Sequence, residues 1–379
     1  MESLVKAPHA KSHCFAGAFA GKRVLVTGHT GFKGSWLVEW LLALGAEVTG
    51  LALPPPTEPS LFDQLDLTGR ITDLRGDIRD LTLVQKALAT AAPDFVFHLA
   101  AQPLVLLSYE QPLETFATNV MGTVNLLEAV RLAGKPCAVV VVTTDKCYEN
   151  TGQRHGYREE DPMGGHDPYS ASKGAAELVA AAYRRSYFSA PDSSVKIASG
   201  RSGNVIGGGD WARDRIVPDC IRSLQCGEAI PVRNRHATRP WQHVLEPLSG
   251  YLWLAARLPV GNALAEALDS AFNFGPWAET NHTVRVLVEE ILKHWPGSWE
   301  DRTVPGAVHE AAMLSLATDK AQRLLGWQPA WDFAKTIAHT VDWYRLISKD
   351  ATRAAACTRQ HIEDYTASAR ALNLSWSHE

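Results

Sequence analysis

Residues 22–34 read KRVLVTGHTGFKG, an apolar run followed by a loop with three glycines. Such glycines permit a tight turn and a close approach of the backbone to a pyrophosphate. After the loop, apolar residues recur at helical spacing over residues 36–44, and Gly45 follows as the expected helix end. Because a helix N-terminus favours a bound anion, this strand, loop and helix predict a dinucleotide-binding site.

Apolar runs alternate with helical segments along the first half of the chain. This alternation, from Arg23 to about Gly200, is typical of an α/β fold with a Rossmann-type doubly wound parallel sheet. Strands are expected at residues 22–27, 47–53, just before Asp77, and at 95–99, 138–142 and 195–199.

The composition of the chain changes beyond residue 200, where a GGGDW segment is followed by most of the tryptophans and a cluster of arginines. We interpret this part as a smaller C-terminal substrate-binding lobe over the carboxyl ends of the sheet, where ligands of such folds bind. The predicted division is a frayed N-terminal extension at 1–20, a dinucleotide-binding Rossmann domain at 21–200 completed by 241–275, and the substrate-binding lobe at 201–240 and 276–379.

Two short motifs in the middle of the chain carry chemistry. Tyr169 and Lys173 are one helical turn apart, so the ammonium can lie beside the phenol and favour its ionised form. A phenolate next to a nicotinamide takes a hydroxyl proton while the carbinol hydrogen leaves as hydride. Thr144, Asp145 and Lys146 follow a Val-rich strand and add an acid and an amine that alcohol oxidation alone does not need. The extra pair predicts a second reaction after the oxidation.

The adenosine end of the expected site is less clear from the residues. The second strand runs into Pro54 without the acidic residue that usually holds the ribose. His29 and Lys33 could instead accept a 2′-phosphate, so the residues alone leave NAD and NADP both open. Asp77 either hydrogen-bonds the adenine amino group or caps the helix expected at 81–92.

Small residues after the fourth strand would let a dinucleotide lie flat on the strand ends, and Asn119 could bridge backbone groups beside it. The complete set of expected cofactor-binding residues is Gly28, Thr30, Gly31, Phe32, Lys33, Gly34, Asp77, Ile78, Leu99, Ala100, Ala101, Asn119, Thr143, Tyr169 and Lys173.

Composition and charge exclude several classes of protein. The 379 residues, 46% of them hydrophobic, can build a large core. A net charge of −4 without a long basic run argues against nucleic-acid binding, and no apolar run approaches the length of a membrane helix. The six cysteines form no Cys-x-x-Cys pair, and the histidines lack metal-ligand spacing. We expect a soluble cytoplasmic enzyme with reduced thiols, no metal and no membrane contact.

The chain resembles the extended short-chain dehydrogenase/reductase group of nucleotide-sugar enzymes over nearly all of its length after residue 20. Within that group it is most similar to the dehydratases that act on CDP-glucose. Related dTDP-glucose dehydratases carry Thr-Asp-Glu where this chain has Thr-Asp-Lys, and plain 4-epimerases lack the acidic member. The segments that carry the resemblance are VTGHTGFKGSW (26–36), TTDKCYEN (143–150), DPYSASK (167–173), RSGNVIGGGDW (201–211), RPWQHV (239–244) and LGWQPAW (325–331).

The resemblance implies NAD as cofactor, CDP-glucose as substrate, and a homodimer or a dimer of dimers. The hypothesis that follows has Tyr169 remove the proton from the glucose 4-hydroxyl, with Thr144 holding the oxygen and hydride passing from C4 to NAD⁺. Lys146 then removes the C5 hydrogen, Asp145 protonates the departing 6-hydroxyl, and hydride returns to C6 to give CDP-4-dehydro-6-deoxyglucose.

Some alternatives stay open at this point. As a base, Lys146 needs a pKa several units below the usual ~10.4; otherwise it only orients groups, and another residue or a water is the base. A 4-epimerase, decarboxylase or dehydratase for another nucleotide sugar would share the first oxidation. A non-catalytic NAD-binding regulator would be expected to lose Tyr169 or Lys173, and both are present.

The arginines between Trp211 and Trp241 suit a diphosphate because their planar forks bind phosphate bidentately, although a solvated basic surface is the alternative. A backbone carbonyl within 205–208 or 232–235 is expected to read the cytosine amino group, and helices at 113–132 and 171–187 are expected to pair two subunits. The complete set of expected substrate-binding residues is Gln102, Asn204, Trp211, Arg215, Arg233, Arg235, Arg239 and His243.

Overall fold

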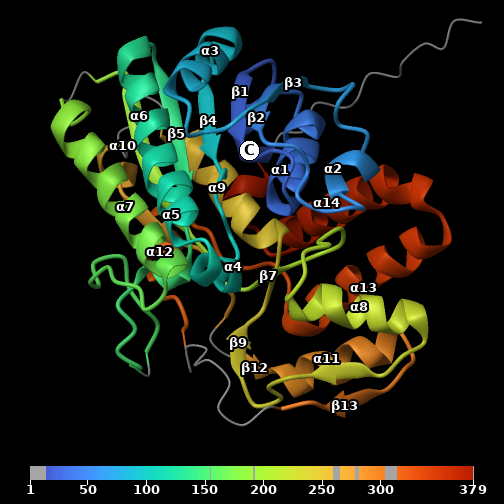
Figure 1. The fold of residues 1–379 in the computed structure, drawn as a ribbon. Coiled ribbons are helices and arrows are strands. Elements are labelled where there is room, and N and C mark those ends of the chain that lie inside the picture. Colours follow the sequence, from blue (N-terminus) through green and yellow to red (C-terminus); the bar gives the residue numbers. More distant parts are fainter. Residues whose placement is uncertain are drawn as a thin grey trace, which may run out of the picture.

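The structure is a computed structural model that describes residues 14–378 except 154, 191–192, 259–264, 278–280 and 304–313. Parallel strands form a central sheet: β1 Arg23–Thr27, β2 Glu47–Ala52, β3 Thr72–Arg75, β4 Phe95–His98, β5 Cys137–Val142, β6 Val195–Arg201 and β11 Ala271–Asn273. Their order is β11-β6-β5-β4-β1-β2-β3 (Figure 1). The chain order reverses between β1 and β4, which is where doubly wound sheets bind ligands.

Helices cover both faces of this sheet (Figure 1). The covering helices are α1 Phe32–Ala43, α3 Leu81–Ala91, α6 Gly122–Ala133, α7 Pro168–Tyr187, α9 Leu245–Arg257 and α14 Ala354–Ala371. Successive side chains of a strand point to opposite faces. Val139 and Val141 of β5 therefore pack with α3, α6 and α7, whereas Val140 and Val142 pack with α1, α9 and α14. Burial on both faces explains why the central strands β4 and β5 are almost entirely apolar.

The predicted doubly wound parallel sheet is confirmed, and each predicted strand end lies within two residues of the observed one. Gly45 has a φ of +82° and ends α1 as expected. The seventh strand, β11, comes from the segment that was expected to complete the sheet, and it pairs in parallel with β6.

The chain after β6 builds short strand pairs and further helices below the carboxyl ends of the sheet (Figure 1). Their apolar side chains belong to the same core cluster as α1 and α9, so packing continues without a break from the sheet into this region. The pairs join β7 Val205–Ile206 to β10 Gln242–His243, β8 Ile230–Val232 to β13 Trp299–Asp301, and β9 Thr238–Pro240 to β12 Asn281–Thr283. The helices are α8 Ile216–Cys226, α11 Val284–His294, α12 Asp319–Leu325 and α13 Phe333–Lys349.

Shorter helices complete the described fold: α2 Leu61–Gln64, α4 Val105–Glu110, α5 Pro112–Phe116 and α10 Ala265–Leu268. Helical turns occur at Cys14–Gly17, Asp145–Cys147, Ala351–Arg353 and Ser375–Ser377, and a π-helical turn at Ala117–Met121 joins α5 to α6. Among the described helices, none has the length and apolarity needed to cross a membrane.

Residues 14–20 belong to the core, which corrects the prediction that the first twenty residues fray. The Phe15 ring stacks on Trp376 with centroids 5.0 Å apart and meets Trp40 edge-on at 5.5 Å. Phe19 is buried against Phe95 of β4. Two buried aromatic side chains outweigh the weak hydrophobicity of the segment as a whole. Residues 1–13 of the predicted extension lie outside the described residues.

Candidate active site

The glycine loop meets the end of β4 where the order of the sheet reverses. Gly28 has a φ of +76°, and a Cβ there would lie 2.6 Å from the backbone nitrogen of Ala100. A Cβ on Gly34 would collide with the Gly28 carbonyl oxygen, whereas Gly31 has more room. Gly31, the residue directly before α1, has no side chain that could cap the helix, so the first backbone N–H groups of this helix are left for a bound phosphate. The loop therefore fits a dinucleotide pyrophosphate.

Buried hydrogen bonds fix the two strands on either side of this reversal. Thr27 Oγ1 lies 2.7 Å from His98 Nδ1, and His98 Nε2 lies 3.1 Å from Thr123 Oγ1. Burial, helped by the nearby charge of Lys173, lowers the pKa of His98 to about 3. The ring is therefore neutral and serves to join β1, β4 and α6.

Both cations that the sequence suggested for a 2′-phosphate are engaged elsewhere. His29 is fully buried, and its Nε2 lies 2.8 Å from Asp73 Oδ1 on β3. Lys33 Nζ donates to Ser202 Oγ at 3.0 Å, at the end of β6. Lys33 thus points into the site below the sheet and away from the adenosine end.

Asp77 is not the cap of the following helix. Its carboxylate pairs with Arg79 at 2.5 Å, and Asp80 caps α3 by accepting from the Leu83 backbone N–H at 3.1 Å. The helix-cap alternative for Asp77 is therefore wrong. Its carboxylate is partly exposed, and its contact with an adenine amino group stays a prediction. Ile78 beside it is buried in the core.

Asn119 orders the loop after β4, as the sequence suggested. Its Nδ2 donates to the Gln102 carbonyl at 3.1 Å and to Ser172 Oγ at 2.8 Å, while its Oδ1 accepts from the Gln102 N–H at 2.8 Å. The side chain of Gln102 donates to the Leu104 carbonyl at 3.1 Å and to Thr115 Oγ1 at 2.8 Å. Gln102 therefore holds its own loop together, which corrects the substrate contact predicted for its side chain.

The predicted catalytic residues come together at the carboxyl end of β5. Tyr169 and Lys173 lie on the first turns of α7, which Asp167 caps. Thr144 follows β5, and its hydroxyl donates to Asp145 Oδ1 at 2.9 Å and also hydrogen-bonds with Tyr169. A phenol, a hydroxyl and a carboxyl group are thus adjacent, as a sugar carbinol would require.

Burial controls the protonation of these groups. It raises the pKa of Tyr169 to about 12 and raises the pKa of Asp145 even though the charge of Lys146 opposes it. It lowers the pKa of Lys173 to about 8, although the Glu177 carboxylate acts in the other direction. A carboxyl group with a raised pKa retains a proton more easily, which is the form that a proton donor needs.

One carboxyl oxygen of Asp145 has no partner. Asp145 Oδ2 is buried and makes no hydrogen bond with any described residue. A Cβ on Gly203 would collide with this oxygen, so the glycine leaves the space that the carboxyl group occupies. Since an unsatisfied buried polar atom costs about 1–3 kcal/mol, a substrate hydroxyl at this position would be stabilised.

The two lysines of the motifs have different surroundings. Lys173 Nζ donates to the Val142 carbonyl at 3.3 Å, so the structure has the ammonium bonded to β5 and not to the Tyr169 phenol. Lys146 is partly exposed next to Asp145, and its backbone N–H lies 3.4 Å from Thr144 Oγ1.

The comparison with known families agrees with this arrangement. The family model described as GDP-mannose 4,6 dehydratase matches residues 25–340. The chain belongs to this family. Within the GDP-mannose 4,6-dehydratase family, it is 48% identical over 352 residues to a CDP-glucose 4,6-dehydratase of Salmonella typhimurium, covering 91% of this chain and 96% of that protein. It is 31% identical to a dTDP-glucose 4,6-dehydratase of Streptomyces antibioticus, covering 85% and 92%.

Solved structures show the same fold. A UDP-glucose 4-epimerase of Thermus thermophilus in complex with NAD is 28% identical, with a TM-score of 0.73 over 85% of this chain and 99% of that one. A dTDP-glucose 4,6-dehydratase of Streptomyces venezuelae with NAD bound is 29% identical, with a TM-score of 0.72 over 86% and 97%. The resemblance to nucleotide-sugar enzymes is confirmed at the level of the family.

The arginines predicted to bind substrate in this family member fall into two groups. Arg215 is paired with Asp210 at 2.8 Å, and its charge opposes the rise of the pKa of Tyr169 that burial causes. The charge of Arg239 opposes the rise of the pKa of Asp145 in the same way. These two arginines lie at the site.

Arg233 and Arg235 lie on an exposed loop. Arg233 Nη1 is 3.0 Å from Asp214 and Arg235 Nη1 is 3.1 Å from Asp301, and about two thirds of the Arg233 side chain is exposed. For this pair the structure agrees with the solvated basic surface, the alternative that the sequence left open.

His243 lies in the core, which corrects the substrate contact predicted for it. The side chain is fully buried, and its ring packs edge-on against Trp36 at 5.7 Å and against Trp331 at 4.8 Å. Trp211 is half inside the same core, where it packs against Tyr344 and donates to Gln64 Oε1 at 3.0 Å. Asn204 lies between β6 and β7 with a φ of +24°.

Several carbonyls proposed to read cytosine are already used within the protein. The Gly207 and Gly208 carbonyls accept from Tyr344 Oη at 3.3 Å and Trp36 Nε1 at 2.9 Å, and the Ile206 carbonyl accepts from a backbone N–H. The Val232 and Arg235 carbonyls also accept backbone hydrogen bonds. The carbonyls of residues 205, 233 and 234 remain candidates.

Sequence reasoning missed three polar side chains that lie under the site. The Ser202 hydroxyl, which accepts from Lys33, is 2.7 Å from the Tyr251 hydroxyl of α9. Glu177 follows Lys173 by four residues on α7 and is fully buried. The spacing Tyr169, Lys173, Glu177 at successive turns was the available signal for Glu177.

Proposed function

We propose that this chain catalyses the NAD-dependent 4,6-dehydration of CDP-glucose to CDP-4-dehydro-6-deoxyglucose. The observation that carries the proposal is the 48% identity, over 91% of the chain, to a CDP-glucose 4,6-dehydratase. The site supports it, because Asp145 adds a buried acid to the Tyr169 and Lys173 pair that an alcohol oxidation uses.

The residues at the sheet reversal fit NAD. The glycine loop and the first N–H groups of α1 would hold its pyrophosphate, and Asp77 would contact the adenine. When bound, NAD accepts two electrons from the sugar C4 and returns them to C6 in the same turnover.

The chain itself supplies the proton transfers. Tyr169, ionised with help from the Lys173 charge, takes the proton of the 4-hydroxyl, while the Thr144 hydroxyl holds the same oxygen. The resulting ketone acidifies the C5 hydrogen, which Lys146 removes as the base and returns to C5 once hydride has reached C6. Asp145, whose burial favours the protonated state, donates its proton to the departing 6-hydroxyl.

The test is an assay of the purified enzyme with CDP-glucose, dTDP-glucose, UDP-glucose and GDP-mannose in parallel. We expect a 4-keto product, detected by its absorbance in strong base, from CDP-glucose. Conversion to a 4-epimer without loss of water would contradict the proposal and favour the epimerase alternative. Turnover of a different nucleotide sugar alone would contradict the CDP-glucose assignment.

We also propose a homodimer that pairs α7 and the helices from α5 to α6 across a two-fold axis. Large apolar side chains are exposed on these helices: Leu113 at 86%, Met121 at 51%, Leu132 at 53%, Leu178 at 61% and Tyr187 at 56%. Exposed apolar side chains gathered on neighbouring helices are typical of an interface.

The proposal also includes a domain division and a cellular location. The sequence-based boundaries stand as its domain division: a cofactor-binding part at 21–200 with 241–275, and a nucleotide-sugar lobe at 201–240 with 276–379. All six cysteines are free thiols, which suits a reducing compartment, and we place the enzyme in the cytoplasm.

A further inference from the structure

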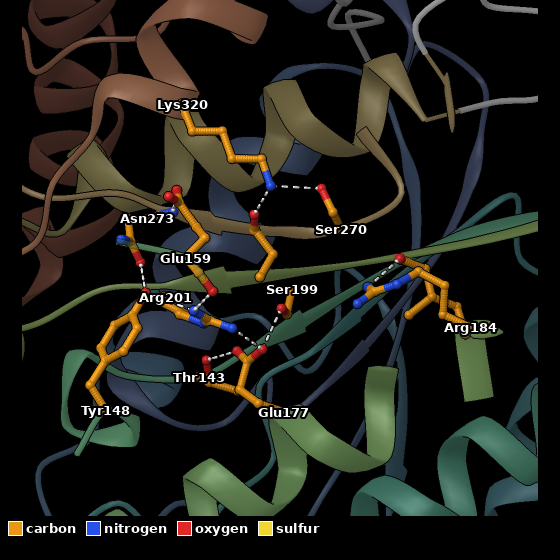
Figure 2. A network of polar contacts seen from close by, with 12 residues as sticks. Thr143, Tyr148, Glu159, Glu177, Arg184, Ser199, Arg201, Ser270, Asn273 and Lys320 are labelled. Atoms are coloured by element: carbon orange, nitrogen blue, oxygen red, sulfur yellow. Dashed lines mark hydrogen bonds and ion pairs between the residues drawn. The ribbon is translucent and has the colours of Figure 1, made fainter. Parts of the chain in front are cut away.

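Glu177 lies at the centre of a buried network under the site (Figure 2). Its Oε1 accepts a short hydrogen bond from the Thr143 hydroxyl, and its Oε2 accepts from Ser199 Oγ at 2.7 Å and from Arg201 Nη2 at 2.8 Å. Only 4% of the residue is exposed. All three donors and the carboxylate are therefore removed from water.

These contacts join three elements that carry the site. Glu177 is on α7, one turn after Lys173, and Ser199 and Arg201 are on β6. Thr143 is the first residue after β5 and directly precedes Thr144. Glu177 thus fixes the end of β5, where the acid-bearing segment begins, to the helix that carries the Tyr169 phenol.

Arg201 holds the other side of the network. Its Nη1 donates to the Tyr148 hydroxyl at 2.6 Å and to the Glu159 carbonyl at 3.2 Å, and the Tyr148 hydroxyl donates to Asn273 Oδ1 at 2.7 Å (Figure 2). A buried ion pair of this kind is weak evidence for stability, because desolvation of both charges offsets most of their attraction. Its position beneath the catalytic residues points to a different role.

That role concerns the charge of Lys173. The pKa of Lys173 is lowered to about 8 in total, because burial lowers it more than the Glu177 carboxylate raises it. Burial also opposes ionisation of Glu177, but the charge and hydrogen bond of Arg201 hold the pKa of Glu177 below its usual range. Glu177 is therefore a permanent negative charge beside Lys173.

The other titratable groups around Lys173 do not supply this charge. His98 of β4 is neutral, because burial lowers its pKa to about 3, and the Cys147 thiol is neutral, because burial raises its pKa. Lys33 of α1 is a like charge, and burial lowers its pKa to about 7. Burial raises the pKa of Tyr169, one turn earlier on α7, to about 12, so this phenol supplies no negative charge at neutral pH.

We propose that Glu177, anchored by Arg201, is a positioning residue of the reaction: through Thr143 it fixes Thr144 and Asp145 against the Tyr169 phenol, and its charge keeps the Lys173 ammonium protonated. This inference rests on the proposed function, since the reaction there needs a charged Lys173 and an ordered Asp145. Glu177 does not touch the reacting atoms and acts only through these neighbours.

The first test is Glu177→Gln, which keeps the shape of the side chain and removes the charge. Lys173 should lose its proton at lower pH, so the alkaline limb of the kcat/KM profile should move to lower pH by about one unit. The KM for the nucleotide sugar should change little, because no substrate contact is lost. An alkaline limb at the wild-type pH would overturn the charge role.

The second test separates position from charge. Glu177→Asp keeps the carboxylate but shortens the side chain by one methylene, so the contact with Thr143 is lost. We expect a lower kcat at an unchanged alkaline limb. A kcat equal to that of the wild type would overturn the positioning role.

A matched control and a folding control accompany these variants. Glu39 lies on α1, away from the catalytic residues, and its carboxylate is equally buried and pairs with Arg70 and Arg359. Glu39→Gln should therefore leave the alkaline limb in place. Glu177→Gln removes the ion-pair partner of Arg201, so the double variant Glu177→Gln/Arg201→Gln removes both charges together. The double variant should show the same shift of the alkaline limb of the kcat/KM profile. An alkaline limb at the wild-type pH in this variant would overturn the proposal.

A direct titration distinguishes failure of this inference from failure of the proposed function. If the wild-type enzyme converts no nucleotide sugar, the proposed function fails. Side-chain NMR of ¹⁵N-lysine-labelled protein then still reports the Lys173 midpoint, which a Lys173→Met spectrum assigns. The proposal predicts a lower midpoint in Glu177→Gln than in the wild type and in Glu39→Gln, and equal midpoints would overturn it.

Discussion

The Thr144 hydroxyl donates a hydrogen bond to Asp145 Oδ1 at 2.9 Å and leaves Asp145 Oδ2 buried without a hydrogen bond to any described residue. Burial raises the pKa of this carboxyl group. A carboxyl group that retains its proton more readily than usual, with one oxygen free of hydrogen bonds to the described residues, is thus held next to the Tyr169 phenol. The account assigns elimination to Asp145 and oxidation to Tyr169, and the two roles can be separated by substitution.

Asp145→Asn should slow loss of water about 10²–10⁴-fold while C4 oxidation continues. The amide keeps the shape of the side chain but cannot protonate a leaving hydroxyl. With CDP-glucose, stopped-flow absorbance should therefore show reduced nicotinamide accumulating on the enzyme. A variant that neither forms reduced nicotinamide nor releases product would contradict this division of roles.

Tyr169→Phe should lower kcat by about 10²–10⁴-fold, because only the proton acceptor for the 4-hydroxyl is lost. Binding of NAD and of CDP-glucose, measured by calorimetry, should stay close to the wild type. A near-normal kcat would remove Tyr169 from the mechanism.

Activity should fall as the pH rises through about 8, where Lys173 loses its charge. The effect on stability has the opposite sign. Because burial lowers the pKa of Lys173 from 10.5 to about 8, the unfolded chain binds more protons between these values, and this group's contribution to stability rises with pH across that window. The kcat/KM profile and urea unfolding at several pH values measure the two effects.

Lys173→Arg is the informative variant, because arginine stays charged at every accessible pH. Residual activity in this variant should no longer decline near pH 8. A decline at the same pH as in the wild type would assign the alkaline limb to another group.

CDP-glucose should be preferred over dTDP-glucose by ~10⁴ or more in kcat/KM. The glucose and both phosphates are the same, so discrimination comes from the nucleoside. The cytosine amino group donates where thymine accepts, and dTDP-glucose also lacks the ribose 2′-hydroxyl and carries the thymine methyl group. A pocket with an acceptor for that donor leaves a buried acceptor unpaired when thymine enters. Competition between the two substrates measures the ratio, and comparable values would contradict the substrate assignment while leaving the dehydratase chemistry intact.

Leu178→Glu should disrupt the proposed dimer. The side chain is 61% exposed on α7, and a charge there would have to be buried between subunits. Sedimentation should give twice the chain mass of 41.4 kDa for the wild type and 41.4 kDa for the variant. Leu372→Glu, at a similarly exposed leucine after α14, is the matched control and should remain dimeric. A monomeric wild type at micromolar concentration would contradict the proposal.

The sequence predicted those features that local patterns encode. The apolar runs set the strands, and the spacing of the loop glycines set the phosphate-binding turn, because each depends on neighbours along the chain. The roles of Tyr169 and Lys173 followed from helical periodicity, which places both on one face of α7. The resemblance to nucleotide-sugar enzymes added the chemistry of Asp145.

Features that depend on distant partners could not be predicted. His243 looked like a ligand residue, but Trp36 and Trp331 enclose it in the core. Lys33 looked like a phosphate contact, but Ser202 on the other side of the sheet reversal determines where it points. Phe15 lies in a weakly hydrophobic segment, and the distant Trp40 and Trp376 account for its burial.

The central claim is that hydrogen leaves C4 and returns to C6 of the same sugar. Incubation of the enzyme with CDP-glucose carrying deuterium at C4, followed by mass spectrometry and NMR of the product, tests it most directly. The account predicts a 4-keto-6-deoxy product with deuterium at C6. Deuterium that returns to C4 of an epimerised hexose, or a 6-deoxy product without deuterium at C6, would contradict it.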